Sequence, residues 1–419
     1  MTAATRVSRS TFWRSVCRLL LAGIAVLLAL ALDLSATVPP GKTPTAEQAR
    51  RARDVVSSAV RSLRHGKGLA MLHADRADIA SATTLATSLG KFGRFDSSIE
   101  TNALVLRVSR RFGFIWINGE VRLSSNINGF PETRLKIGDL PLGPTLSRYA
   151  INLARLVVRW RGVQAPPLET LVRMVRIDPD TVSALVYLPL NGAFANDLSG
   201  LRRAPVDAAL TASIYCRLTA LNRNEPATDM EIIVGRAFLP SRSTLPIVEQ
   251  NRAAFVALAM YTTLPEAGRL AGDAAQRVKA CRSPSVKPTL AGRADLAAHW
   301  SLSAALAVSL GDDIGGAMGE WKELSDSRPG GSGFSFVDLA ADRAGLALAR
   351  RAVSPQTAAT IAARLRAASG EDLVPVRALA LSEGLSERAF VEKYQTLDSA
   401  QFAAAKARID RVIAGTIGR

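Results

Sequence analysis

The chain has 419 residues, of which 48% are hydrophobic and 21% are charged. This composition is typical of a folded protein of two or three domains, and it excludes a disordered or low-complexity chain. The 53 lysines and arginines exceed the 36 acidic residues, which gives a formal net charge of +17. Only 5% of the residues are aromatic, too few to suggest base-stacking surfaces for nucleic acid.

The first 36 residues carry the clearest signal in the chain. Arg6, Arg9, Arg14 and Arg18 precede an unbroken apolar run, Leu19–Leu32, and no acidic residue lies before that run. Positively charged flanks stay on the cytoplasmic side of a membrane. The sequence therefore predicts a single-pass protein of the cytoplasmic membrane, with its body on the periplasmic, extracytoplasmic side.

Two fates remain open for residues 1–36. A span needs about 20 apolar residues and a signal peptide uses a shorter run, so Leu19–Leu32 falls between the two. Val16, Cys17 and Leu34 extend the run to spanning length, which favours a retained signal anchor. Ala29-Leu30-Ala31 has the A-x-A pattern of a cleavage site, which favours a signal peptide.

Export would determine which anionic partners the basic body can meet. Without the four N-terminal arginines the body keeps +13 of the +17, in a compartment that holds no DNA. The expected partners are therefore the membrane, with anionic lipid or an acidic envelope glycan, and no nucleic acid is expected. A general arginine bias of the genome explains the same charge equally well. Cys216 and Cys281 would lie in an oxidising compartment, where a disulfide between them is allowed but not required.

The next segments change from helical to strand periodicity. Residues 37–100 are expected to hold a linker at Thr37–Lys42 and then a helical section that opens at Thr45–Gln48. Residues 101–190 are expected to be a β-rich α+β region. Alternation from Leu104 onward predicts a meander, with an apolar helix at Leu146–Trp160 lying on its sheet. A further hairpin is expected around Asp178-Pro179-Asp180.

The spacing of apolar residues predicts helices in the remainder of the chain. Residues 191–290 form a helical region, in which Leu210, Ile214, Leu218 and Leu221 share one face. Residues 291–419 form a helical C-terminal domain. The predicted fold class is therefore α+β: an N-terminal transmembrane helix, a β-meander region with packed helices, and an all-helical C-terminal domain.

Polar residues are concentrated between residues 295 and 351. Asp295 and His299 stand four residues apart on an otherwise apolar helix, so they share a face. Acidic residues then recur at helical spacing on two further segments, and a glycine-rich loop separates these segments. The acidic residues are Glu320, Glu323, Asp326, Asp338 and Asp342, and the loop is Pro329–Gly333. Gly311, Gly315 and Gly319 recur every fourth residue, which favours close approach of a second helix.

Two interpretations of this constellation stay open. His299 with Glu323, Asp326, Asp338 and Asp342 could form a hard nitrogen and oxygen site for manganese, iron or magnesium, or a general acid/base cluster. These five residues are the candidate catalytic residues, and the cofactor is left unassigned. The structural alternative makes His299 a core residue, Ser335 a helix cap and Lys322 the partner of two acids. The glycine loop lacks the Lys-Ser/Thr of a P-loop, and no second histidine lies nearby to serve a serine hydrolase.

The same region carries a family resemblance. The stretches Gly292–Trp300, Gly319–Ser327 and Gly331–Gly345, with Asn251–Ala254, resemble an uncharacterised family of bacterial envelope proteins with an N-terminal membrane segment. The order of aspartate, histidine, acidic helix and then the aspartate-rich helix is distantly similar to VanZ-like and YfiM-like envelope proteins. Asp342 stands where many of those have asparagine. The resemblance implies an envelope protein and assigns no reaction.

Together these features predict a membrane-anchored envelope protein that binds lipid, glycan or another envelope protein. The alternative function is a metal-dependent envelope enzyme, a hydrolase, that uses His299, Glu323, Asp326, Asp338 and Asp342. The two functions differ in whether the five side chains converge on one point.

Overall fold

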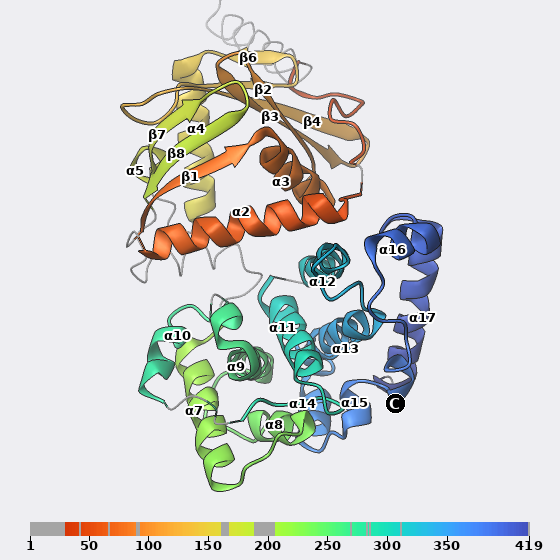
Figure 1. Cartoon of the computed structure of the whole chain (residues 1–419). Coiled ribbons are helices and arrows are strands. Elements are labelled where there is room, and N and C mark those ends of the chain that lie inside the picture. Colours follow the sequence, from red (N-terminus) through yellow and green to blue (C-terminus); the bar gives the residue numbers. More distant parts are fainter. Residues whose placement is uncertain are drawn as a thin grey trace, which may run out of the picture. The chain divides into compact units, whose positions relative to one another are not determined.

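The computed structural model describes residues 30–41, 43–65, 68–88, 93–160, 167–187, 206–268, 270–281, 284, 286–310 and 312–417. The chain divides into two compact units (Figure 1). The first comprises Met1–Lys42, Ala70–Arg155 and Pro167–Tyr187, and the second comprises Thr43–Leu69, Leu156–Pro166 and Leu188–Arg419. Both sheets lie in the first unit and the C-terminal part is helical, so the predicted α+β class is confirmed.

The predicted membrane segment falls largely outside the described residues, because residues 1–29 are not among them. Within the described ranges, no helix combines the length and the apolar character that crossing a membrane requires.

The first unit contains two antiparallel arrangements of strands. The five-stranded sheet has the order β2-β3-β4-β5-β6: Arg94–Glu100, Ala103–Phe112, Ile115–Ser124, Thr133–Ile137 and Leu140–Leu142. The three-stranded sheet has the order β1-β8-β7: Leu69–Asp75, Thr181–Tyr187 and Val172–Ile177. Three helices accompany them: α3 (Arg76–Ser88), α4 (Pro144–Trp160) and α5 (Leu168–Leu171).

The predicted meander is confirmed in position and register. Leu104 lies opposite Leu123, and Leu106 lies opposite Val121, so the alternating apolar residues of β3 and β4 face the same side. The hairpin at residues 172–187 is also confirmed. The helical section expected at residues 37–100 contains two strands as well, β1 and β2. The sequence of β2 gives little apolar alternation, and its pairing with β3 together with the burial of Ile99 makes it a strand.

The linker expected at Thr37–Lys42 is wrong for its described residues, because this segment is bonded to the sheet. Val38 is buried, and its backbone N–H donates to Ser109 Oγ at 2.9 Å. The Thr37 N–H donates to Asn118 Oδ1 at 3.1 Å. The buried polar side chains of β3 and β4 therefore give this segment the partners that a free linker would take from water.

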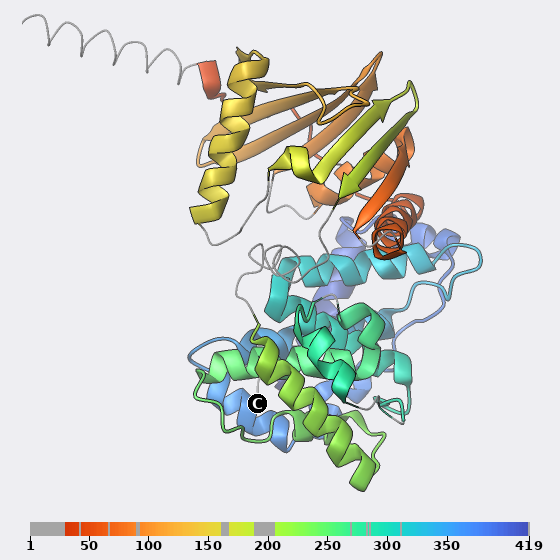
Figure 2. The same cartoon turned by 90° about the vertical axis from the view of Figure 1, so that its left-hand side faces the viewer.

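Helix α4 forms where the sequence predicts it, but the expected packing on the sheet is wrong. Of its described side chains, only Ser147 is buried. Ser147 Oγ accepts from the Leu135 N–H at 2.9 Å and donates to the Leu142 carbonyl at 3.0 Å. The large apolar residues Leu146, Leu153, Leu156, Val157 and Trp160 remain exposed. Figure 2 shows the helix at the margin of the β-containing unit.

The second unit is built from helices around one core. It contains α2 (Ala46–His65) and then, in chain order, α7 (Ala208–Asn224), α8 (Met230–Ala237), α9 (Ile247–Ala267), α10 (Ala274–Arg277), η2 (Val278–Ala280), α11 (Ala294–Leu310), α12 (Asp312–Asp326), α13 (Phe336–Ala352), α14 (Ala358–Arg366), α15 (Gly370–Leu373), η3 (Val376–Ala378), α16 (Glu387–Tyr394) and α17 (Ala400–Ile417). One buried cluster runs from Leu218 through Phe255 and Trp300 to Phe402. The two helical segments expected at 191–290 and 291–419 therefore share a single core.

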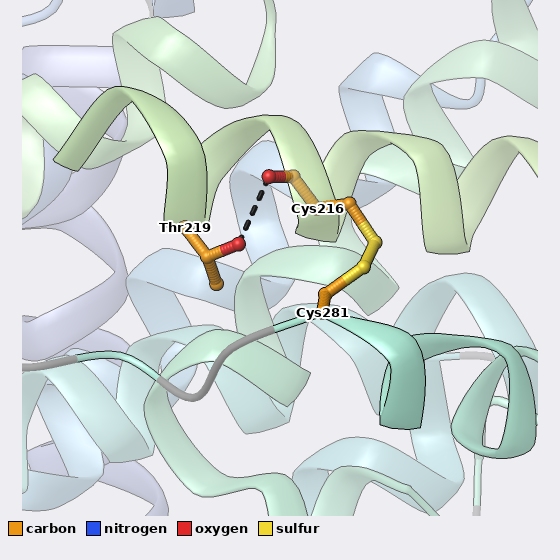
Figure 3. Close-up of a disulfide and its surroundings, with 3 residues drawn as sticks. All are labelled: Cys216, Thr219 and Cys281. Carbon is orange, nitrogen blue, oxygen red and sulfur yellow. Dashed lines mark hydrogen bonds between the residues drawn. A yellow bond between two sulfur atoms is a disulfide. The ribbon is translucent and has the colours of Figure 1, made fainter. Parts of the chain in front are cut away.

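A disulfide joins two early segments of this helical unit. Cys216 of α7 is bonded to Cys281, which directly follows η2, with 5.5 Å between their Cα atoms (Figure 3). Thr219 Oγ1 donates to the Cys216 carbonyl at 2.9 Å in the same turn of α7. The pairing that the sequence allowed is thus present.

Candidate metal centre

Close packing of α11 against α13 sets the position of the polar cluster. A Cβ atom placed on Gly345 of α13 would lie 2.1 Å from the Trp300 carbonyl oxygen of α11, so only glycine fits there. Ser335 caps the N-terminus of α13, and its Oγ accepts from the Asp338 N–H at 3.0 Å. The close contact at Gly345 and the cap at Ser335 together place the first two turns of α13 beside His299.

His299 lies at the centre of the cluster and is buried. Its Nδ1 is 3.0 Å from Asp342 Oδ1, and its Nε2 is 3.4 Å from Asp338 Oδ2 and 3.8 Å from Glu323 Oε1. The three carboxylates come from α12 and α13 and are buried too. Residues of α12 and α13 therefore place three carboxylates around the His299 imidazole of α11, two near Nε2 and one at Nδ1.

Asp342 holds the imidazole from the Nδ1 side. Its Oδ1 also accepts from Ser303 Oγ at 2.7 Å, so this oxygen has two donors when His299 Nδ1 carries its proton. That tautomer leaves Nε2 with a free lone pair. Asp342 Oδ2 is buried and has no hydrogen-bond partner among the described residues. A Cβ on Gly319 would come within 2.6 Å of that oxygen, so the glycine makes room for the carboxylate.

Glu323 and Asp338 face Nε2 on the opposite side of the ring. Glu323 Oε2 accepts from the Ser335 N–H at 3.0 Å. In a full capping box the side chain of residue 338 would accept from this N–H instead. Its other oxygen, Oε1, lies 3.0 Å from Lys322 Nζ. Asp338 Oδ1 lies 3.1 Å from Arg293 Nη2. Asp338 thus has one oxygen bonded to Arg293 and the other near His299, whereas the Glu323 oxygen near His299 also accepts from Lys322.

Burial dominates the electrostatics of the cluster. Desolvation raises the pKa of Glu323 to about 7, although Lys322 and His299 act against it. Desolvation also raises the pKa of Asp338. For His299 desolvation acts downward on the pKa, but the charge of Asp342 and its hydrogen bond outweigh it, so this pKa is raised. A buried carboxyl that titrates near neutral pH is typical of functional sites.

The structure separates the five candidate residues into three roles. His299, Glu323 and Asp338 each offer a ligand atom, and these atoms all lie within 4.8 Å of one another. Asp342 lies behind the imidazole and contacts Nδ1. Asp326 lies outside this group, and its two oxygens accept from Lys322 Nζ and Arg53 Nη1, each at 3.0 Å.

Other residues from the sequence analysis have structural places. Asp295 pairs with Arg293 at 2.6 Å and is largely exposed, so it lies at the rim. The glycine loop closes on the end of α12: the Gly333 N–H donates to the Asp326 carbonyl at 2.8 Å, and Gly333 has a positive φ of 89°. These bonds account for the loop without an anion. Lys322 does pair with two acids, as the structural interpretation expected.

Sequence reasoning missed Ser303, Arg293 and the backbone N–H of Ser335. Ser303 stands four residues after His299, so the spacing of one helical turn could have identified it. Arg293 and the Ser335 N–H reach carboxylates that lie 45 and 12 residues away, and no local pattern signals such contacts.

The cluster has the composition of a site for a divalent transition metal. With metal–ligand bonds of about 2.1 Å, neighbouring ligand atoms lie roughly 3.0–3.4 Å apart. The distances of 3.4 and 3.8 Å from His299 Nε2 therefore need little contraction. A ligating histidine usually donates its other ring N–H to a carboxylate, as His299 does to Asp342. Three protein ligands would leave positions for water or substrate.

None of the family models, curated proteins or solved structures compared with this chain matches it. The resemblance to envelope proteins described above therefore stays a prediction.

Proposed function

We propose that this chain is an extracytoplasmic protein with a divalent-metal centre, and that it acts as a metal-dependent hydrolase. The observation that carries the proposal is the convergence of His299 Nε2, Glu323 Oε1 and Asp338 Oδ2, with Asp342 bonded to the far side of the imidazole. One imidazole and two carboxylates suit manganese, iron or zinc.

The rim of the site favours an anionic substrate. Lys322 and Arg293 stand over the buried carboxylates, and their side chains are 43% and 36% exposed. A bound metal would take over the charge compensation of Glu323 and Asp338. A negatively charged group at the open positions would then share Lys322 with Asp326 and Arg293 with Asp295 and Glu383. The metal would supply a water of lowered pKa. Phosphate esters and carboxylate-bearing glycans have the required charge.

Two observations support the extracytoplasmic location. The arginine-rich start and the apolar run favour export of the body. The disulfide between Cys216 and Cys281 is of a kind that persists in oxidising compartments.

The metal content of the purified full-length chain tests the proposal. After incubation with Mn²⁺ or Zn²⁺ and gel filtration, elemental analysis should find about one metal ion per chain. His299→Ala should lose that ion. His73→Ala is the matched control, because His73 is an exposed histidine of the β-containing unit that contacts Ser183 at 2.9 Å and should retain full metal content.

A second pair of variants tests the assignment within α12. Glu323→Gln should lose the metal, while Asp326→Asn, one turn further along the same helix, should keep it. Equal metal content in wild type and His299→Ala would reject the proposed centre. Hydrolysis of a chromogenic phosphodiester that follows metal occupancy would support the reaction class, and metal binding without any hydrolysis would reject the enzymatic part alone.

A further inference from the structure

Helix α4 in the β-containing unit presents an apolar stripe that no described part of the chain covers. Leu146, Tyr149, Leu153, Leu156 and Trp160 lie three or four positions apart, which places them on one face. All five are exposed, with 69% of Tyr149, 63% of Leu153 and 81% of Trp160 accessible. An exposed apolar stripe of this length marks an interaction surface.

The attachment of α4 fixes the direction of this stripe. Ser147 is the buried residue that bonds α4 to β5 and β6, and Ile151 one turn later is half-buried. At 100° per residue these two positions lie roughly opposite the apolar stripe. The stripe therefore faces outward from the unit.

The charge of α4 favours an anionic surface. No aspartate or glutamate occurs between Pro144 and Trp160. Arg148 is exposed and lies about 80° around the helix from the edge of the stripe, whereas Arg155 is partly exposed and lies nearer to Ile151. Tyrosine and tryptophan with flanking arginines are the residues that amphipathic helices use where headgroups meet acyl chains.

The N-terminal apolar run is tied to the same unit without a free linker. Leu30, which belongs to that run, accepts at its carbonyl from the Asp139 N–H at 2.7 Å. Asp33 pairs with Trp116 through two backbone hydrogen bonds of 2.9 and 2.7 Å. Asp139 precedes the start of α4 by five residues. If residues 19–32 lie in a membrane, the β5–β6 turn is held at its surface.

A second exposed apolar group lies at this end of the sheet. Phe112 ends β3 and Phe114 lies in the turn between β3 and β4, and they are 52% and 77% exposed. Trp116, which pairs with Asp33, is the second residue of β4 and follows this turn directly. An aromatic residue thus bonds the segment that follows the apolar run, and two exposed phenylalanines lie on the adjoining turn of the same sheet.

We propose that α4 lies on the outer surface of the membrane, with its apolar stripe in the acyl boundary and Arg148 at anionic phospholipid headgroups. The occupant of the stripe is a lipid bilayer. Leu146, Tyr149 and Leu153 of this surface lie in the β-containing unit, and the surface shares no residue with the metal centre.

Site-directed fluorescence in the full-length chain tests the inference. An environment-sensitive fluorophore is attached to Leu153→Cys, in a Cys17→Ser background that leaves the disulfide intact. Asp180→Cys, on the exposed turn between β7 and β8, is the control. The proteins are reconstituted into phosphatidylcholine vesicles with or without phosphatidylglycerol, and nitroxide-labelled lipids serve as quenchers.

The label at residue 153 should emit at shorter wavelength and be quenched by the nitroxide lipids, while the label at residue 180 should report water. Phosphatidylglycerol should increase the quenching, and Arg148→Glu should reverse that increase. A blue shift without lipid quenching would show that the N-terminal segment or a second copy covers α4, and an unshifted label would show an open surface. Either result overturns the proposal, and equal quenching in both lipid mixtures overturns its anionic part.

Discussion

Asp342 Oδ1 is hydrogen-bonded to both His299 Nδ1, at 3.0 Å, and Ser303 Oγ, at 2.7 Å. One carboxylate oxygen of α13 therefore orients two side chains of α11. Ser303 lies one turn after His299, and its hydroxyl fixes the carboxylate that in turn fixes the imidazole. The pair His299 and Asp342 therefore has the arrangement of a ligand and its orienting residue.

Asp342→Asn tests this relationship. The amide retains the shape of the carboxylate but accepts less strongly, and it can present a donor to Nδ1, which favours the wrong tautomer. We expect the affinity for Mn²⁺ or Zn²⁺ to fall about 10–100-fold while the helical content is retained. Ser303→Ala should have a smaller effect in the same direction. Titration calorimetry measures both, and an unchanged affinity in Asp342→Asn would remove Asp342 from the site.

Gly319→Ala tests the space around the same carboxylate. The new methyl group would lie 2.6 Å from Asp342 Oδ2 and would displace it from His299. We expect a loss of about 1–3 kcal/mol in the free energy of unfolding, together with weaker metal binding. Chemical denaturation and metal titration measure the two effects.

The control for this substitution is Gly316→Ala in the same helix. Its Cβ would meet Leu346 Cδ1 at 3.7 Å, an ordinary contact. Alanine is the better helix former, so this change should be neutral or stabilise the fold by up to about 1 kcal/mol. If Gly319→Ala behaved in the same way, the close contact would not constrain the site.

Local patterns predicted the elements of the site but not the way in which they meet. Spacing placed Asp338 and Asp342 on one face of α13 and identified Ser335 as its cap, because both depend on residues within one turn. Glu323 and Asp326 are equally acidic and three residues apart. In the structure Glu323 accepts from the Ser335 N–H, while Asp326 pairs with Arg53 of α2, 273 residues away, and no local pattern signals that ion pair.

In the β-containing unit, too, local patterns predicted the elements but not their long-range contacts. Alternation predicted β3, β4 and β5, whose apolar residues repeat every second position. It gave no sign that Val38 would be buried against Ser109, because that contact is made by a segment 71 residues away. The stripe of α4 was visible in the sequence, but amphipathicity does not say whether a sheet or a membrane covers it.

Removing the disulfide should destabilise the helical unit. The bond closes a loop with a sequence separation of 65 residues between α7 and the end of η2. We expect the double variant Cys216→Ser, Cys281→Ser to lose about 2–5 kcal/mol in the free energy of unfolding. Cys17→Ser, outside the described residues, is the control and should not change it. A faster-migrating band on non-reducing gels should distinguish the oxidised wild type, and its absence after export would contradict the pairing.

The pH dependence of stability follows from the three raised pKa values. Glu323 titrates near pH 7 in the fold and near 4.5 when unfolded, so the unfolded chain loses its proton first as pH rises. The raised pKa of Asp338 acts in the same direction. Protonated His299 is favoured in the fold, and its contribution is lost as pH rises through its raised pKa. The metal-free protein should therefore become less stable from about pH 5 to pH 8.

The variant Glu323→Gln isolates the contribution of Glu323 to the pH dependence of stability. A difference between pKa values of 4.5 and about 7 corresponds to about 3 kcal/mol of stability lost above pH 7, so the variant should show a flatter profile than wild type. Metal ligation needs deprotonated carboxylates and a free Nε2, so Mn²⁺ or Zn²⁺ should bind more tightly, with proton release, over the same range and should offset the loss. Melting temperatures at several pH values, with and without metal, measure these effects. If the metal-free wild type and Glu323→Gln had parallel profiles, the buried carboxyl would not titrate in this window and the proposed ligand set would lose one of its members.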